Sequence, residues 1–182
     1  MNLNNIYPNR DVAIEIGFGM GHATWQIAKD NPNIGYIGIE VHTPGVGRLL
    51  HQMNAHDVTN LRVIEHDAVE VIDHMIPKDS ISGVHIFFPD PWQKKKHHKR
   101  RLIQVEFIKK ILNVVKPGGY IYVVSDWVEY AEHILDVFNK VDGLSNPYNG
   151  YATAQDWRPK TKFESKGLDK NHVINEILFR KE

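Results

Sequence analysis

The chain has 182 residues, of which 42% are hydrophobic and 24% are charged, with 22 basic residues against 22 acidic ones. That composition predicts a single globular domain over residues 1–182. The absence of cysteine excludes disulfides, Cys-zinc sites and thiol nucleophiles, and no stretch approaches the roughly 18 apolar residues of a membrane span. The first residues, MNLNNIYPNRD, lack a signal-peptide pattern, so we expect a cytoplasmic protein with no membrane contact.

Strand-like and helix-like segments alternate along most of the chain. Apolar runs predict strands at 12–17, 34–41, 61–67, 84–90 and 120–126. Helices are predicted at 22–32, 44–56, 68–75, 101–115 and 127–140, the fourth ended by Pro117-Gly118-Gly119. This alternation is typical of an α/β fold, with a mostly parallel sheet covered on both faces.

The last third departs from this rhythm. Residues 142–160 are rich in Gly, Asn, Pro and aromatic residues, which indicates a long surface loop. Loops of that length are usually functional or mobile. Residues 161–167 and 172–181 then resemble two closing strands joined by a turn, with no helix between them.

A glycine turn follows the first predicted strand, in the segment EIGFGMG (15–21). Gly17, Gly19 and Gly21 let the backbone pass close to a nucleotide-type ligand at the carboxyl edge of the sheet. A dinucleotide fingerprint requires Gly or Ala where this chain has His22, which disfavours a nicotinamide-dependent dehydrogenase. Glu15 suits a ligand with a cationic amine or sulfonium and would repel a pyrophosphate.

Two further acids end the next two predicted strands. Glu40 is placed to accept hydrogen bonds from both hydroxyls of a ribose, and Asp67 from an adenine amino group. With Glu15, they describe a pocket for S-adenosyl-L-methionine. The alternative is a structural glycine turn with solvated acids at the strand ends.

The segment FFPDPWQKKKHHKRR (87–101) combines a lone acid with the densest positive charge of the chain. Prolines on both sides stiffen the backbone around Asp90, and Trp92 offers an aromatic face for a base. Six Lys or Arg within 94–101 can neutralise phosphates, although such runs are often only solvated. Beside the pocket, this pattern favours a nucleic-acid base as methyl acceptor.

Several motifs together resemble the bacterial tRNA (guanine-N(7)-)-methyltransferases. They are EIGFGMG (15–21), GIEVHTPGVG (38–47), FPDPWQKKKHHKRR (88–101), SDW (125–127) and TKFESKG (161–167). The similarity runs from about Val12 to Phe179. The glycine turn is shared by many methyltransferases, whereas FPDPW with the basic run is specific to this family.

The resemblance implies a Rossmann-like three-layer fold, whose seven-stranded sheet has an antiparallel last strand. It implies methyl transfer from S-adenosylmethionine to the 7-nitrogen of a guanine in the tRNA variable loop, leaving S-adenosylhomocysteine, with Asp90 as catalytic residue. The implied cofactor-binding residues are Glu15, Gly17, Gly19, Gly21, Glu40, Asp67 and Asp90. The implied substrate-binding residues are Lys94, Asp126, Thr161, Lys162, Phe163 and Glu164, and the implied RNA-binding residues are Lys96, His97, His98, Lys99, Arg100 and Arg101.

Other readings stay open at this point. Enzymes that methylate an amine of adenine or cytosine place an acid or Asn, two prolines and an aromatic at this strand end, but only one proline follows Asp90. A non-catalytic RNA-binding relic is motivated by the eleven residues before the first strand, where the family usually has a few dozen. The eleven histidines show no metal-ligand spacing, so we predict no metal. The oligomeric state is not predicted.

Overall fold

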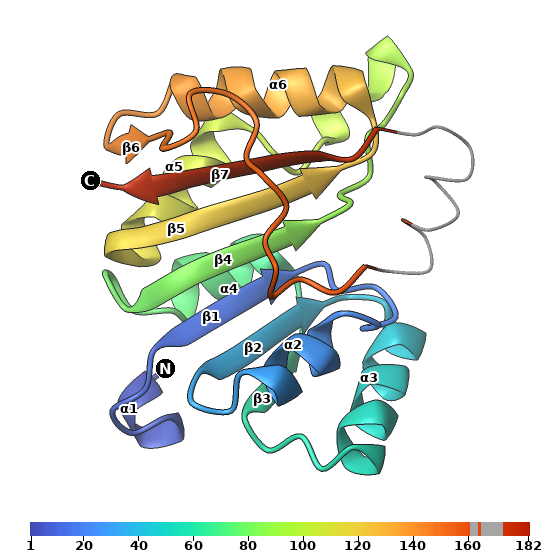
Figure 1. Cartoon of the computed structure of the whole chain (residues 1–182), viewed down its shortest axis with the longest axis vertical. Coiled ribbons are helices and arrows are strands. Elements are labelled where there is room, and N and C mark those ends of the chain that lie inside the picture. The colour runs from blue at the N-terminus through green and yellow to red at the C-terminus, as the bar shows by residue number, and fades with distance from the viewer. Residues whose placement is uncertain (161–163, 165–172) are drawn as a thin grey trace.

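A single seven-stranded sheet organises the protein, seen in a computed structural model that describes residues 1–160, 164 and 173–182. The strand order is β3-β2-β1-β4-β5-β7-β6 (Figure 1). The strands are β1 (Val12–Ile16), β2 (Gly35–Glu40), β3 (Leu61–Glu65), β4 (Ile81–Phe87), β5 (Val115–Ser125), β6 (Leu144–Ser145) and β7 (Asn175–Lys181). Strands β1 to β5 pair in parallel, and β7 runs antiparallel to both β5 and β6. The predicted α/β class and antiparallel last strand are confirmed.

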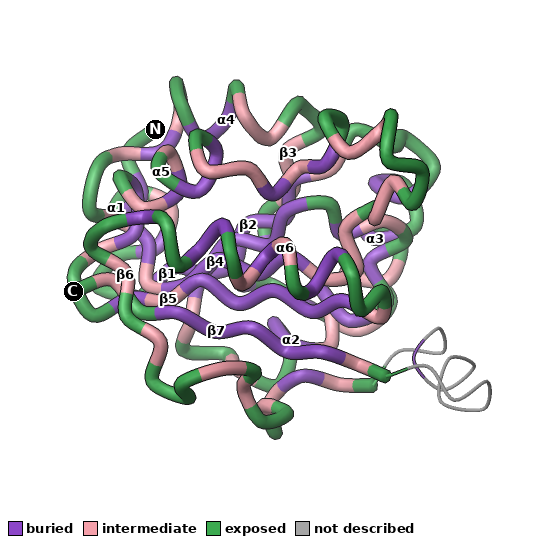
Figure 2. The backbone as a smooth tube through the Cα atoms, turned by 90° about the horizontal axis from the view of Figure 1, so that it is seen from above, coloured by how far each residue is buried: buried purple, intermediate pink, exposed green. Residues whose placement is uncertain are grey.

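Helices cover both faces of this sheet. They are α1 (Leu3–Ile6), α2 (Thr24–Asp30), α3 (Thr43–Ala55), α4 (Ala68–His74), α5 (Val105–Val114) and α6 (Val128–Asn139), with a 3₁₀ helix, η1 (Lys95–Arg100). Strand β1 shows how the faces divide, because successive side chains of a strand point to opposite sides. Val12, Ile14 and Ile16 pack into the larger core with α4, α5 and α6. Ala13 lies in the second core with α2 and α3, and Figure 2 shows buried strands between helices that are buried on one side and exposed on the other.

Part of the second face is covered by a loop where a helix layer was expected. Residues 146–160, here called the strap, cross in front of β7, β5 and β4 (Figure 1). The Trp157 ring lies 4.8 Å from that of His85 and 5.5 Å from that of Tyr122. Burial lowers the pKa of His85 to about 3, and its Nε2 lies 2.9 Å from the Tyr120 hydroxyl. The predicted long loop is therefore the hydrophobic cover of the β4–β5 region.

Several predicted boundaries were wrong. The strand predicted to end at Asp90 ends at Phe87, and the one predicted to end at Asp67 ends at Glu65. Pro117-Gly118-Gly119 lies within β5 at a register shift, and a side chain on Gly119 would meet the Ser82 carbonyl oxygen at 2.9 Å. The helix predicted from 101 begins at Val105, because residues 101–104 form a non-helical connection after η1.

The C-terminal prediction is tested only in part. The predicted strand 161–167 and the turn after it lie outside the described residues, apart from Glu164. The strand predicted over 172–181 is present as β7, from Asn175 to Lys181. Within the part of the chain that the structure describes, no helix has the length and apolar character needed to cross a bilayer.

Candidate active site

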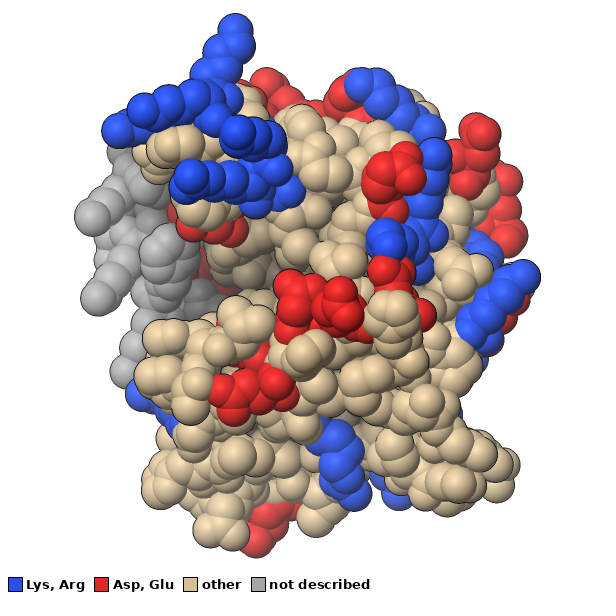
Figure 3. Space-filling view, turned by 180° about the vertical axis from the view of Figure 1, so that it is seen from behind, with Lys and Arg blue, Asp and Glu red and all other residues tan. Residues whose placement is uncertain are grey.

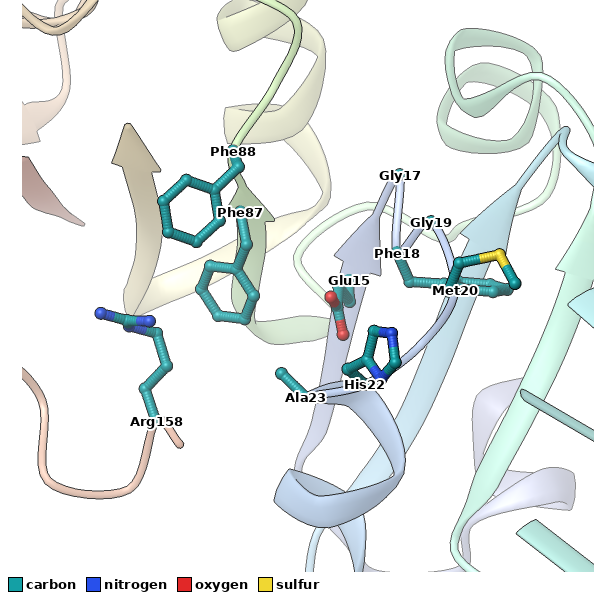
Figure 4. A pocket seen from close by; sticks show the side chains of 10 residues that line it. All are labelled: Glu15, Gly17, Phe18, Gly19, Met20, His22, Ala23, Phe87, Phe88 and Arg158. Atoms are coloured by element: carbon teal, nitrogen blue, oxygen red, sulfur yellow. The ribbon is translucent and has the colours of Figure 1, made fainter. Parts of the chain in front are cut away.

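A cavity of about 380 Å³ opens at the carboxyl ends of β1 and β4. Figure 4 shows the glycine turn, Glu15 and His22 on one side, Arg158 of the strap on the other, and Phe87 and Phe88 between them. The lining residues are Glu15, Gly17, Phe18, Gly19, Met20, His22, Ala23, Phe87, Phe88 and Arg158. This is the edge at which open α/β sheets bind ligands, and the volume suits a nucleoside-sized molecule.

The glycine turn has the geometry that its residues predict. Gly17, Gly19 and Gly21 have φ values of +69°, +60° and +72°. Residues other than glycine rarely adopt this left-handed backbone conformation. Added side chains at Gly17 and Gly19 would meet nothing within 4 Å, so backbone alone borders the cavity there. A Cβ on Gly45 of α3 would lie 1.9 Å from the Gly19 carbonyl oxygen. Gly45 therefore permits α3 to touch the turn.

Glu40, at the end of β2, holds the glycine turn through a hydrogen bond. Its Oε2 accepts a hydrogen bond from the Gly19 N–H over 2.7 Å. Its Oε1 accepts from the N–H groups of Val41 and His42 over 2.7 and 3.1 Å. Each carboxylate oxygen has two lone pairs, so acceptor capacity remains for a ribose hydroxyl. Glu40 thus braces the turn beside the cavity without lining it.

Glu15 is a buried acid that faces the cavity. Only 6% of the residue is exposed, and burial, with a smaller contribution from the charge of Glu40, raises its pKa to about 7. The buried hydroxyl of Thr24 lies next to the Glu15 carboxylate and offsets part of this rise in its pKa. A carboxyl group that is costly to ionise favours a cationic ligand, which would stabilise its charged form.

Asp67 has a local structural partner in addition to its predicted role. It is the N-cap of α4, and its Oδ1 accepts a hydrogen bond from the Glu70 N–H over 3.0 Å. The residue is exposed at the same sheet edge, outside the lining of the cavity. The role of Asp67 as acceptor for the adenine amino group stays a prediction.

Asp90 sits in a tight loop after β4. Its Oδ1 accepts a hydrogen bond from the Trp92 N–H over 3.0 Å, and the residue is exposed. Phe88 and Trp92 have φ values of +50° and +43°, which are strained for side chains of that size. Such strain is concentrated at functional sites. The loop thus holds the Asp90 carboxylate in a restrained, solvent-exposed position. It lies at the same edge of the sheet as the cavity.

The basic run forms an exposed surface beside this loop. Lys94, Lys95, Lys96, Lys99 and Arg100 are exposed, whereas His97 and His98 are half-buried. The Arg100 guanidinium lies 5.1 Å from the centre of the Trp92 ring, and His97 packs edge-on against the same ring at 5.8 Å. One face of Trp92, predicted to stack on a base, is therefore covered by Arg100. Figure 3 shows the cationic cluster at the upper left, with acidic side chains just beneath it.

Arg101 differs from the other cations of the run. Its side chain is 1% exposed and forms an ion pair with Glu129, whose pKa is lowered by the hydrogen bonds from Arg101. Its guanidinium carbon also lies 4.6 Å from the centre of the Tyr130 ring. The predicted contact of Arg101 with RNA would require this buried guanidinium to leave Glu129 and Tyr130.

Arg158, which sequence reasoning missed, anchors the strap at the cavity. Its Nη1 and Nη2 donate to the two carboxylate oxygens of Glu164 over 2.7 Å each, and Nη2 also donates to Glu176 over 2.8 Å. Tyr122 donates to Glu176 and accepts from Arg158 Nε over 3.2 Å. Burial alone lowers the pKa of Arg158, but its hydrogen bonds to Glu164 and Glu176 raise that pKa above its ordinary value. The local pattern WRPK does not predict that Arg158 is buried in an ion-pair network.

The remaining predicted substrate residues fall into three groups. Asp126 follows directly after β5 and is half-buried, and Lys94 is exposed at the start of η1. Thr161, Lys162 and Phe163 lie outside the described residues. Glu164 is buried in the ion pair with Arg158. In the described residues no three His, Asp or Glu side chains form a metal-sized group, and the absence of a metal stays a prediction.

The strand order and the glycine turn give a Rossmann-like fold, and solved structures of methyltransferases share it. The 16S rRNA methyltransferase KamB superposes with a TM-score of 0.70 at 11% identity, covering 99% of this chain and 93% of KamB. A structure described as "a putative methyltransferase from streptococcus mutans in complex with SAH" superposes with a TM-score of 0.63 at 14% identity, covering 99% of this chain and 93% of that one. At such identities the likeness shows the fold alone.

Sequence comparison identifies the family. A family model described as "Putative methyltransferase" matches residues 9–177. The tRNA (guanine-N(7)-)-methyltransferase of Methylobacillus flagellatus is 52% identical over 168 residues, 92% of this chain and 71% of the relative. That of Neisseria meningitidis is 49% identical over 177 residues, 97% of this chain and 74% of the relative. The chain belongs to the tRNA (guanine-N(7)-)-methyltransferase family.

Proposed function

We propose that this protein transfers a methyl group from S-adenosylmethionine to the 7-nitrogen of a guanine in the variable loop of tRNA, in the cytoplasm. The observation that carries the proposal is the meeting of three features at one edge of the sheet. A cavity with a buried acid, the restrained Asp90 loop and the exposed cations of η1 lie together there. Donor, base and phosphates thus each have a complementary surface.

The residues around the cavity fit S-adenosylmethionine. The open backbone of the glycine turn and Glu40 suit the ribose, while buried Glu15 suits the cationic amine or sulfonium. S-adenosylmethionine supplies an electrophilic methyl group on a positively charged sulfur. Asp67 would accept a hydrogen bond from the adenine amino group through an oxygen that does not cap α4.

The acceptor atom needs no general base. The 7-nitrogen of guanine carries a lone pair and no proton, so no proton has to be removed before attack. The protein's task is to hold that nitrogen in line with the methyl group, which is a proximity effect. Guanine becomes cationic as the methyl group arrives, so a fixed carboxylate nearby stabilises the transition state.

Asp90 is the carboxylate that suits this role. One of its oxygens is held by the Trp92 N–H, which fixes the side chain without neutralising its charge. We assign it the orientation of the guanine N–H edge and the stabilisation of the developing positive charge. Lys94, Asp126 and the segment Thr161 to Glu164 would hold the substrate. Lys96, His97, His98, Lys99 and Arg100 would contact the RNA backbone.

Methyl transfer to unmodified tRNA tests the proposal. The purified protein is incubated with labelled S-adenosylmethionine and tRNA, and the product is digested to nucleosides and separated by mass spectrometry. We expect 7-methylguanosine, with strand cleavage by aniline mapping to the variable loop. Methylated adenosine or cytidine would instead support an exocyclic-amine enzyme. Absence of saturable donor binding in calorimetry would support the alternative that the protein is a non-catalytic RNA-binding relic of the fold.

A further inference from the structure

Building on the proposed function, we propose that Arg101 is a positioning residue for Asp90 and not an RNA-contacting cation. It acts through the peptide group between Pro91 and Trp92. Arg101 therefore has a different role from Arg100, its neighbour in the same basic run, which is proposed to contact the RNA.

A chain of hydrogen bonds joins Arg101 to Asp90. Arg101 Nε donates to the Pro91 carbonyl oxygen over 2.8 Å. The N–H of the same peptide group belongs to Trp92 and donates to Asp90 Oδ1 over 3.0 Å. The two ends of a planar peptide group are rigidly linked, so fixing its carbonyl also fixes the direction of its N–H. The position of Arg101 therefore sets the position of the Asp90 carboxylate.

Arg101 is itself anchored to α6, through exposed Glu129 and buried Tyr130. Its Nη1 donates to Glu129 Oε1 over 3.1 Å, and its Nη2 donates to the other carboxylate oxygen. Its guanidinium packs on Tyr130, which is fully buried in α6. The hydroxyl of Tyr130 accepts a hydrogen bond from the Ile103 N–H over 3.2 Å, which holds the chain just after Arg101. The fork of the guanidinium thus ties the loop to a rigid helix.

The Asp90 loop needs such an anchor. The positive φ values of Phe88 and Trp92 are strained and persist only where surrounding contacts impose them. A charged donor on the Pro91 carbonyl also polarises the peptide group, which strengthens the bond from the Trp92 N–H to the carboxylate. Arg101 thus restrains the loop and reinforces its hydrogen bond to Asp90.

Arg101 and Arg100 form a matched pair of variants for the test. In Arg101→Met, the rate of methyl transfer at saturating tRNA and donor should fall about 10²-fold, because the reacting groups are misplaced. The half-saturating tRNA concentration and its salt dependence should stay as in the unmodified enzyme. In Arg100→Met, the half-saturating concentration should rise, and the slope of its logarithm against log salt should fall by about one. Lys109→Met, on the exposed side of α5, should change neither quantity.

Two further variants distinguish the positioning of Asp90 by Arg101 from the effect of the Arg101 charge and from a loss of folding. Arg101→Lys keeps the charge but cannot bind Pro91 and both Glu129 oxygens together, so it should also be slow. The double variant Asp90→Asn/Arg101→Met should be no slower than Asp90→Asn, because the two residues act as one unit. Thermal unfolding and donor calorimetry report whether each variant is folded.

The proposal is overturned if folded Arg101→Met, or folded Arg101→Lys where the Met variant does not fold, transfers methyl at the unmodified rate. It is also overturned if the whole loss in Arg101→Met is a higher half-saturating tRNA concentration with a lower salt slope. Failure of the unmodified protein to methylate any guanine would instead count against the proposed function, so the two failures are distinguishable.

Discussion

The N–H of Gly19 donates a hydrogen bond to Glu40 Oε2 over 2.7 Å, joining the glycine turn after β1 to the end of β2. The acid that was expected to bind a ribose therefore also shapes the turn. Because α3 touches the same turn through Gly45, three elements converge on one peptide segment. Substitutions at this junction should act on donor binding first.

Gly45→Ala should weaken donor binding. The added methyl would lie 1.9 Å from the Gly19 carbonyl oxygen, which is part of the backbone and cannot rotate away. We expect the donor Kd to rise about tenfold and the free energy of unfolding to fall by about 1–3 kcal/mol. Calorimetry and urea unfolding measure both quantities.

Gly47→Ala is the matched control in the same helix. A Cβ at Gly47 meets nothing within 4 Å, so the variant should be neutral or more stable by about 0.5–1 kcal/mol. Equal donor Kd values for the two alanine variants would show that the contact between α3 and the turn is not required.

Stability of the free protein should depend on the ionisation of Glu15. Burial raises its pKa from 4.5 to about 7, so between these values the folded protein binds more protons than the unfolded chain. The corresponding stability is present below about pH 4.5 and is lost as pH rises to about 7, by on the order of 3 kcal/mol. In Glu15→Gln this loss should be absent. Urea unfolding of both proteins at pH 4.5, 6 and 8 measures it, and parallel pH profiles would contradict it.

Donor binding should also release protons near neutral pH. A cationic donor favours the ionised form of Glu15, so its pKa should fall on binding. At pH 6.5 the binding enthalpy should therefore vary with the ionisation enthalpy of the buffer. A binding enthalpy that is the same in phosphate and Tris would argue against Glu15 as the partner of the cation.

Arg158→Met should destabilise the protein strongly. Its removal leaves the buried carboxylates of Glu164 and Glu176 without their cation, which costs about 3–5 kcal/mol. Arg180→Met serves as a control, because Arg180 is exposed and should change the free energy of unfolding by less than about 0.5 kcal/mol. Similar urea midpoints for the two variants would show that the buried network contributes little.

Asp90→Asn should slow methyl transfer while leaving the loop in place. The amide oxygen of Asn can still accept from the Trp92 N–H, so only the negative charge is lost. We expect the rate at saturating tRNA to fall about 10²-fold, the scale found for removing one group that stabilises transition-state charge. Turnover close to that of the unmodified enzyme would exclude Asp90 from the stabilising role.

The sequence by itself determined the features that depend on neighbouring residues. The periodicity of apolar residues indicated the alternating strands and helices, and the spacing of Gly17, Gly19 and Gly21 indicated a turn of positive φ. Glu15 near the end of β1 and Glu40 at the end of β2 lie at the same edge of the sheet, because the carboxyl ends of parallel strands meet there. Errors arose where a segment leaves its strand early, as at Phe87, since backbone strain is not visible in residue order.

Only the tertiary structure decided which charges are internal. Arg100 and Arg101 look equivalent in the run, but Arg101 meets Glu129, 28 positions away, and is buried. Arg158 likewise pairs with Glu176 of β7, which the fold brings beneath the strap. A charged side chain stays inside only where partners arrive from distant segments to offset its desolvation. Those partners are set by strand order and loop path, which the local pattern of residues does not encode.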